Sequence, residues 1–264
     1  MIRTCVITGY GINADLELVK AFELAGSQAS RVHVRDILET PQILDNFHVL
    51  AIAGGFSFGD HLGSGKVLAN LFKRRLRGPL DRFVASGKLV IGICNGFQVL
   101  VKMGFLPNLG GDWDQDVSLV HNDSGKFEDR WVTANFDSDS RCIWTRGCAS
   151  MDLPVRHGEG KFIVGSPRVY ELLSRERLVA LRYAAPGGGC CVDYPYNPNG
   201  SHDNIAGICD RTGRIFGLMP HPEAFVIPET HPRWTRRGIP DGHGLAVFRN
   251  GVEHARSADT SHDP

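Results

Sequence analysis

The most constraining stretch of this sequence is an apolar segment, Leu89–Ile93, that runs directly into Cys94. Five consecutive apolar residues predict a strand buried on both faces, and the residues that follow have helical spacing. Glycines two positions before and two positions after Cys94 reproduce the Gly-x-Ser-x-Gly nucleophile elbow with cysteine in place of serine, because this sharp turn leaves no room for side chains there. We therefore expect the thiol to stand exposed above the sheet, at the start of a helix.

A helix N-terminus would make this cysteine reactive. Its unpaired N–H groups and partial positive charge favour the thiolate and lower the pKa of a nearby thiol. Cys94 is accordingly a candidate nucleophile, although a buried structural cysteine is the more ordinary role of a cytosolic cysteine. The stretch alone leaves both interpretations open.

Apolar runs and helical patterns alternate over the first hundred residues. Strands are predicted at residues 2–8, 31–34, 49–53 and 89–93, and helices at 14–25, where Asn13 is the expected N-cap, 65–83 and 97–103. Such alternation is typical of an α/β fold with a doubly wound, mostly parallel central sheet, as in flavodoxin-like proteins. From residue 108 onward the sequence is rich in turns, with strands predicted at 117–120, 131–136, 161–164, 178–183, 205–209 and 214–219.

The chain contains no linker that would separate two domains. We therefore expect one domain over residues 1–256, in which a β-rich region is added to the sheet. Residues 257–264 are polar and are expected to form a disordered tail.

Composition excludes several classes of function. The 29 basic and 29 acidic residues give no net charge, so neither nucleic acid nor an anionic membrane is an expected partner. No apolar run reaches the length of a membrane span, and a cytoplasmic location is expected. The seven cysteines are odd in number and none are spaced as Cys-x-x-Cys, which argues against a disulfide framework and a structural zinc site.

A second candidate feature is the segment Pro220-His221-Pro222-Glu223, which follows a predicted core strand. Two prolines stiffen it, and residues two apart in an extended segment point the same way, so His221 and Glu223 are expected side by side. An imidazole oriented by a carboxylate can take the proton of a cysteine nucleophile and return it later. Open α/β folds place their sites at the carboxyl edge of the sheet, where both segments would lie. We therefore predict a Cys94-His221-Glu223 triad, against the alternative of a proline-rich surface loop.

Glycines after the third predicted strand offer a place for an oxyanion. The segment Gly54–Gly59 would lie near the cysteine, and its backbone N–H groups, together with that of Asn95, could form an oxyanion hole. A flexible turn is the alternative interpretation of these glycines. His157 and Glu159 form a second His/Glu pair, but the glycines around them predict a loop, so we assign His157 a substrate-side or structural role.

One short pattern indicates a different class of function. Gly9–Ala14 matches Gly-x-Gly-x-x-Gly/Ala between a strand and a helix, and Asp36 follows the next strand. This is the pattern of a dinucleotide-binding turn, so a dinucleotide-binding module is the alternative function. The spacing to Asp36 is longer than usual, and nothing later in the chain supplies a hydride-transfer site.

Seven motifs spread over nearly the whole chain carry a resemblance to a known family. They are Gly11–Asn13, Gly54–Asp60, Gly92–Gln98, Asn122–Phe127 with Arg130, His157–Gly160, Asn197–Ser201 and Met219–Glu223. With them the chain resembles the class I (triad) glutamine amidotransferases, and within these the glutaminase component of phosphoribosylformylglycinamidine synthase. The Cys-Asn-Gly elbow, the Gly-Gly-Phe-Ser loop and the Asn-Pro-Asn-Gly turn together are typical of that synthase.

The resemblance implies the class I glutamine amidotransferase fold and roles for individual residues. Cys94 would attack the side-chain amide of glutamine, form a glutamyl thioester and release ammonia. His221 would act as general base and acid, and Glu223 as its orienting partner. The positions that match the oxyanion loop and the glutamine contact are Gly55, Phe56 and Gln98.

The resemblance also implies partners. Ammonia would pass to a separate large synthetase subunit, which uses ATP and magnesium to amidinate formylglycinamide ribonucleotide in purine biosynthesis. A small bridging subunit is a further candidate partner. No ATP site is recognisable in the sequence, so we expect neither a cofactor nor a metal in this chain.

Overall fold

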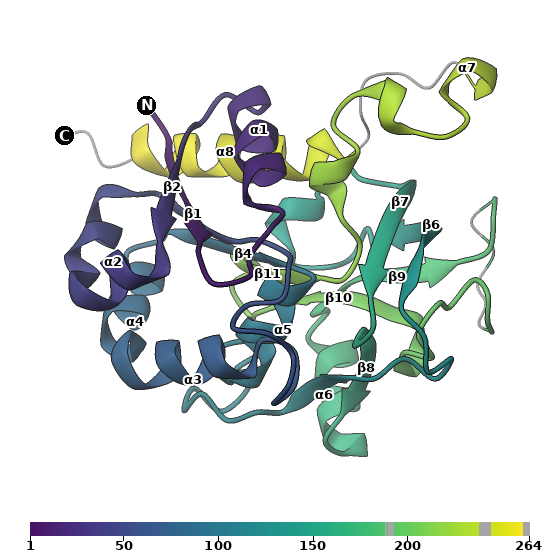
Figure 1. The fold of residues 1–264 in the computed structure, drawn as a ribbon, viewed down its shortest axis with the longest axis horizontal. Helices are drawn as coiled ribbons and strands as arrows, with labels where there is room; N and C mark the ends of the chain where they lie inside the picture. The colour runs from purple at the N-terminus through teal and green to yellow at the C-terminus, as the bar shows by residue number, and fades with distance from the viewer. Residues whose placement is uncertain (188, 190–192, 238–243, 261–264) are drawn as a thin grey trace.

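The computed structural model describes residues 1–187, 189, 193–237 and 244–260. Within these residues the strands form a nine-stranded mixed sheet with the order β2-β1-β3-β4-β11-β10-β9-β6-β7. Helices cover the first half of this sheet on both faces (Figure 1). The predicted α/β class is confirmed. The predicted β-rich region is largely the second half of the same sheet, because β10 pairs with β11 and so joins the two halves.

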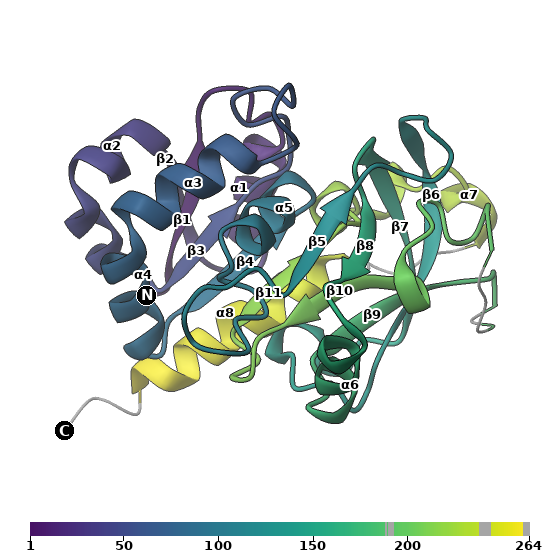
Figure 2. The same cartoon turned by 90° about the horizontal axis from the view of Figure 1, so that it is seen from below.

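The first half of the sheet is parallel. Its strands are β2 (Gln28–His33), β1 (Arg3–Thr8), β3 (Val49–Ile52), β4 (Leu89–Ile93) and β11 (Ile215–Leu218). β3, β4 and β11 are buried along their whole length, as their continuous apolar sequences predict. Helices α1 (Asp15–Leu24) and α8 (Leu245–Thr260) pack on one face, and α3 (Lys66–Arg75), α4 (Arg77–Ala85) and α5 (Asn95–Lys102) on the other (Figure 2). The short helix α2 (Val34–Glu39) follows β2.

The second half of the sheet is antiparallel. It comprises β10 (Ile205–Cys209), β9 (Val179–Ala184), β6 (Glu128–Phe136) and β7 (Ser150–His157). A separate two-stranded sheet, β5 (Val117–Val120) with β8 (Lys161–Val164), lies beside α5, and helix α6 (Pro167–Arg175) follows it. The remaining helical turns are η1 (Pro41–Asn46), η2 (Ile143–Thr145), η3 (His202–Asn204), η4 (Pro222–Ala224), η5 (Pro228–Thr230) and α7 (Trp234–Arg237).

Several elements differ from the sequence predictions, each for a physical reason. The helix predicted at 65–83 is divided at Leu76, because Pro79 has no N–H for a carbonyl one turn earlier and its ring would clash there. Strand β7 was not predicted, since it contains Pro154. That proline lies in the edge strand, where one side of the ladder is free of a partner strand. Helix α1 is capped by Ala14, without a side-chain bond, and not by Asn13.

The C-terminal end also departs from expectation. Residues 257–260, expected in a disordered tail, are the last turn of α8, whose buried side chains Val247, Phe248 and Val252 join the core. The rest of the expected tail, 261–264, lies outside the described residues. Of the helices in the described part of the chain, none combines the length and apolarity needed to cross a membrane.

Candidate active site

Cys94 lies between β4 and α5 in a strained turn. Its φ of 51° and ψ of −104° fall outside the conformations that residues other than glycine ordinarily adopt. A Cβ at Gly96 would come within 2.0 Å of the Ile52 carbonyl oxygen, and one at Gly92 within 2.6 Å of the Gly96 oxygen. The two glycines therefore let α5 approach β3 closely enough to form the predicted nucleophile elbow.

The thiol itself is more enclosed than expected. Cys94 is 5% exposed, and its Sγ lies 3.6 Å from the carbonyl oxygen of Arg156, to which it can donate a hydrogen bond. Arg156 belongs to β7, the strand that the sequence prediction missed. The antiparallel half of the molecule thus forms a wall over the elbow, which explains why the thiol does not stand free above the sheet.

His221 and Glu223 are a buried, hydrogen-bonded pair. Nδ1 of His221 lies 2.6 Å from Oε1 of Glu223. Both residues are 2% exposed, and the contact forms across the start of the turn η4 and not within an extended segment. A carboxylate can only accept a hydrogen bond, so Nδ1 carries a proton, and Nε2 is the nitrogen left to exchange a proton with a neighbour. No other described residue bonds that buried Nε2 atom.

The cysteine and the histidine face each other across Gly54. A Cβ built on Gly54 would lie 2.8 Å from Cε1 of His221 and 3.6 Å from Cβ of Cys94, so only a hydrogen atom fits between them. Burial by itself lowers the pKa of His221, but the negative charges of Glu223 and Cys94 and the hydrogen bond to Glu223 outweigh it and raise that pKa to about 10. The environment of His221 therefore favours the imidazolium.

Two backbone N–H groups at or next to the elbow are candidates to bind an oxyanion. Gly55 N–H and Asn95 N–H have no hydrogen-bond acceptor among the described residues, and the latter is the first N–H of α5. Phe56 N–H, in contrast, donates to the Gly11 carbonyl at 2.8 Å. The Phe56 N–H is therefore already used and is not available as a donor in the predicted oxyanion loop. The Phe56 side chain is 43% exposed, and its ring centroid lies 6.3 Å from that of Phe127.

The side chains of Asn95 and Gln98 tie the site together. Asn95 Oδ1 accepts a bond from Ser57 N–H at 3.2 Å, and its Nδ2 donates to Gln98 Oε1 at 2.9 Å. Gln98 Nε2 in turn donates to the backbone oxygen of Glu159 at 2.5 Å. These bonds connect the Gly-Gly-Phe-Ser loop, helix α5 and the His-Gly-Glu-Gly loop.

Sequence reasoning missed the ion pair that fixes this last loop. Lys102 Nζ lies 3.2 Å from Glu159 Oε2, and both Glu159 oxygens accept from Ser64 N–H at 3.2 Å. Burial opposes ionisation of Glu159, but Lys102 and the Ser64 N–H lower its pKa below the ordinary value. No short spacing in the sequence signals this pair, because its members are 57 residues apart.

His157 does not form the second His/Glu pair considered from the sequence. Its Nδ1 lies 3.1 Å from Asn122 Oδ1, and the Asn122 amide also bonds the His157 oxygen at 2.8 Å and the Gly160 N–H at 3.0 Å. Burial, together with the positive charge of His221, lowers the pKa of His157 to about 4. This histidine is therefore neutral at ordinary pH and helps to hold the loop, in keeping with the predicted structural role.

The dinucleotide alternative is contradicted by the same packing. In a dinucleotide-binding turn the first N–H groups of the helix face the pyrophosphate. Here Asn13 N–H and Ala14 N–H both donate to the Gly54 carbonyl at 3.2 Å, and the first residue of α1 is the buried Asp15, which pairs with Arg31 at 2.7 Å. The Gly9–Ala14 loop supports the Gly54–Gly55 loop and leaves no place for a phosphate.

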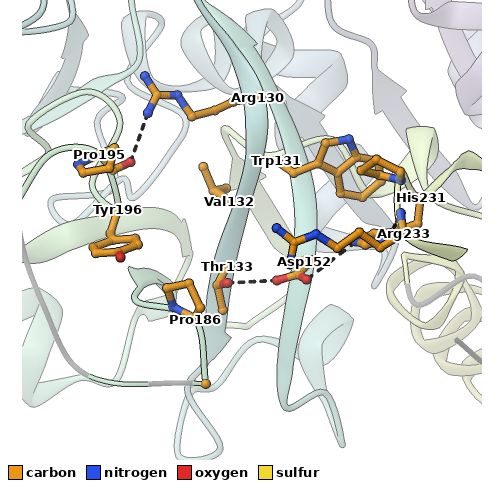
Figure 3. Close-up of a pocket in the computed structure, with 12 residues that line it drawn as sticks. Arg130, Trp131, Val132, Thr133, Asp152, Pro186, Pro195, Tyr196, His231 and Arg233 are labelled. Atoms are coloured by element: carbon orange, nitrogen blue, oxygen red, sulfur yellow. Dashed lines mark hydrogen bonds and ion pairs between the residues drawn. The ribbon is translucent and has the colours of Figure 1, made fainter. Parts of the chain in front are cut away.

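A cavity of about 330 Å³ lies against β6 and β7, and Cys94 is not among the residues that line it. Figure 3 shows these residues. Its polar lining includes Thr133, which bonds Asp152 at 2.8 Å, and Arg130, which donates to the Pro195 oxygen. Among the described residues, no cluster of three or more His, Cys, Asp or Glu side chains could hold a metal ion.

Comparisons with known proteins agree on one family. The sequence model of the CobB/CobQ-like glutamine amidotransferase domain matches residues 1–255. The phosphoribosylformylglycinamidine synthase subunit PurQ of Dehalococcoides mccartyi is 45% identical over 97% of this chain and 98% of its own. The PurQ subunit of Methanococcus maripaludis is 38% identical over 96% of this chain and 97% of its own. The structure of PurLQS from Thermotoga maritima contains a chain that superposes with a TM-score of 0.70 at 29% identity, covering 96% of this chain and 98% of that one.

Proposed function

This chain belongs to the CobB/CobQ-like glutamine amidotransferase family, as a relative of its PurQ subunits, and from that premise we propose that it hydrolyses glutamine through Cys94, His221 and Glu223. The observation that carries the proposal is one constellation. A cysteine in a strained elbow faces the free Nε2 of a carboxylate-bound histidine, and two free N–H groups, Gly55 and Asn95, flank it. This is the set of groups that acyl transfer through a thioester needs.

The first half of the reaction releases ammonia. The Cys94 thiolate attacks the side-chain carbonyl carbon of glutamine, and the developing oxyanion is bound by the N–H groups of Gly55 and Asn95. The C–N bond then breaks as the His221 imidazolium gives its Nε2 proton to the leaving nitrogen, so ammonia departs and a glutamyl thioester stays on Cys94. Glu223 keeps the proton on Nδ1 throughout and stabilises the imidazolium.

The second half regenerates the thiol. Neutral His221 takes a proton from water through Nε2, the resulting hydroxide attacks the thioester carbonyl, and the C–S bond breaks to give glutamate. The sulfur leaves as the thiolate that pairs again with the His221 imidazolium. No group beyond the chain's own residues and water is needed to balance these steps.

We further propose that the ammonia serves a synthetase subunit. The relatives are named as subunits of phosphoribosylformylglycinamidine synthase, and the Thermotoga maritima structure is that of a PurLQS complex. By this analogy, ATP and magnesium belong to the partner, which amidinates formylglycinamide ribonucleotide in purine biosynthesis. A small bridging subunit and a cytoplasmic location are part of the same proposal.

The test separates glutamine hydrolysis from synthesis. The chain is combined with the synthetase subunit from its own organism, and product formation is measured with glutamine and, separately, with ammonium chloride. We expect Cys94→Ala to lower the glutamine-dependent rate on the order of 10³-fold or more, because the nucleophile is lost, and to leave the ammonium-dependent rate unchanged.

Cys148→Ala is the matched control. Cys148 is a partly exposed cysteine that contacts Asn250 of α8, so its loss should leave both rates intact. Glutamine-dependent synthesis that survives in Cys94→Ala would refute the nucleophile. Loss of the ammonium-dependent rate as well would refute the proposed division of labour between the two subunits.

A further inference from the structure

The arginine that precedes His157 lies directly against the proposed catalytic pair. Arg156 Nη2 is 3.3 Å from His221 Nδ1 and 2.9 Å from Glu17 Oε2, and the Arg156 carbonyl oxygen is the acceptor for Cys94 Sγ. Side chains alternate along a strand, so Arg156 faces α1 and the histidine, while His157 faces Asn122 on the other side of β7. Arg156 thus contacts His221 through its side chain and Cys94 through its carbonyl oxygen.

The contact between Arg156 and His221 is not a hydrogen bond. A guanidinium has only donors, and Nδ1 is also a donor because its proton is held by Glu223 at 2.6 Å. Two donors at 3.3 Å repel each other unless negative charge lies close to both. Arg156 interacts electrostatically with Glu223 and with Cys94, and its buried Nε has no hydrogen-bond partner in the described part of the chain.

A partly exposed ion pair does not account for this placement. The Arg156 and Glu17 side chains are 35% and 44% exposed, and such pairs contribute little to stability. A guanidinium turned toward a protonated nitrogen is favourable where negative charge lies close, and Glu223 Oε1 lies 2.6 Å from that nitrogen. The arrangement therefore has its explanation in the charge state of the active site and not in the stability of the surface.

We propose that Arg156 is a positioning residue of the glutaminase site, whose fixed charge holds Cys94 as the thiolate beside His221, and that Glu17 tethers the guanidinium and moderates its effect. The inference rests on the proposed function of Cys94 and His221. The charged and titratable groups around Cys94 and His221 are Glu223 of η4, Arg156 of β7, Glu17 of α1, Tyr183 of β9 and, on the other side of β7, His157.

The sign of the effect follows from charge. A cation beside the pair favours thiolate over thiol and opposes the charge of the imidazolium, so both limbs of the pH–activity profile lie at lower pH than they would without it. Arg156→Gln should therefore move both limbs upward, by about one pH unit for a unit charge at this range. Arg156→Lys retains the positive charge, so its pH–activity profile should stay close to that of the parent. Glu17→Gln removes the opposing charge and should move the limbs downward by a smaller amount.

The experiment follows Cys94 directly and does not depend on turnover. Each variant is treated with iodoacetamide over a range of pH, and alkylation of the Cys94 peptide is measured by mass spectrometry. The kcat/KM for glutamine is measured over the same range, and thermal unfolding reports whether each variant is folded. Cys94→Ala provides the blank for the peptide assignment.

Opposite shifts in Arg156→Gln and Glu17→Gln, with rescue by Arg156→Lys, are the result we expect. A lowered rate with an unmoved profile in all three variants would overturn the inference, because a merely structural arginine acts in that way. If Arg156→Gln does not fold, Glu17→Gln still decides, since that side chain is partly exposed and its profile must move downward. Normal glutaminase activity through Cys94 with unmoved profiles refutes only the role of Arg156, whereas glutamine hydrolysis by Cys94→Ala refutes the proposed function itself.

Discussion

The two halves of the sheet hold their parts of the candidate site by different means. In the parallel half, backbone geometry places the cysteine: Cys94 has a positive φ, and Gly92 and Gly96 allow α5 to approach β3. In the antiparallel half, buried amide side chains hold the loops in place through hydrogen bonds to the backbone. Asn122 binds both ends of the His-Gly-Glu-Gly loop, and Asn199 donates to the Gly160 oxygen at 2.8 Å and to the Tyr183 hydroxyl at 3.1 Å.

This difference indicates what each half can tolerate. A close backbone approach fails when a single methyl group is added, because backbone atoms cannot move aside. A hydrogen-bonded loop fails when a partner is removed and buried polar groups are left unsatisfied. Adding a methyl group should therefore destabilise the parallel half, whereas removing an amide side chain should destabilise the antiparallel half.

The largest effect is expected from Gly96→Ala. The new Cβ would lie 2.0 Å from the Ile52 carbonyl oxygen, so α5 must move away from β3 and take the elbow with it. We expect a loss of about 4 kcal/mol in the free energy of unfolding, or failure to fold, measured by urea denaturation. Gly110→Ala is the control, since that glycine is exposed and a Cβ there meets nothing within 4 Å. A Gly96→Ala protein within about 1 kcal/mol of the parent would show that the close approach is not required.

A somewhat smaller effect is expected from Asn122→Ala. Truncation leaves the His157 oxygen, the Lys126 oxygen and the Gly160 N–H without their partner, which should cost about 3 kcal/mol by urea denaturation. The parallel half should fold as before, so the near-ultraviolet circular dichroism of the core should be kept. Asn70→Ala, on the exposed face of α3, should change stability little. If both alanine variants behave alike, the loop is not held by its amide.

The smallest of the three effects is a pH dependence that belongs to the antiparallel half. The pKa of His157 is lowered to about 4 in the folded protein, below the value of about 6.5 in an unfolded chain. Its contribution to stability is therefore complete above pH 6.5 and is lost as the pH falls through 4. Between pH 7 and pH 5 we expect a loss of about 2 kcal/mol from this group.

His221 acts in the opposite direction, because its raised pKa makes its contribution complete at low pH and lost as the pH rises through about 10. The comparison must therefore be made between the parent and His157→Asn, each unfolded by urea at pH 7 and pH 5. The variant should show the shallower loss, while His121→Asn, at an exposed position, should follow the parent. Equal losses in parent and His157→Asn would exclude this histidine as the source.

Much of the parallel half could be predicted from the sequence. Continuous apolar runs predicted β3 and β4, and the Gly-x-Cys-x-Gly spacing predicted the turn at Cys94, because these features depend on residues adjacent in the chain. The antiparallel half was harder to predict. Strand β7 was missed because it contains Pro154. A proline is tolerated there because β7 lies at the edge of the sheet, and only the assembled fold defines that position.

By itself, the sequence determined which reactive groups the chain carries and the local backbone that presents them: a cysteine on an elbow, and a histidine two residues before a glutamate. The tertiary structure decided what surrounds them. It enclosed the thiol under β7, used the Phe56 N–H for Gly11, and brought Arg156 to His221 and Glu17 from 65 and 139 residues away. The physical reason is range, since dihedral preferences and steric limits act between neighbours, whereas the charges around a site are set by the order in which strands join the sheet.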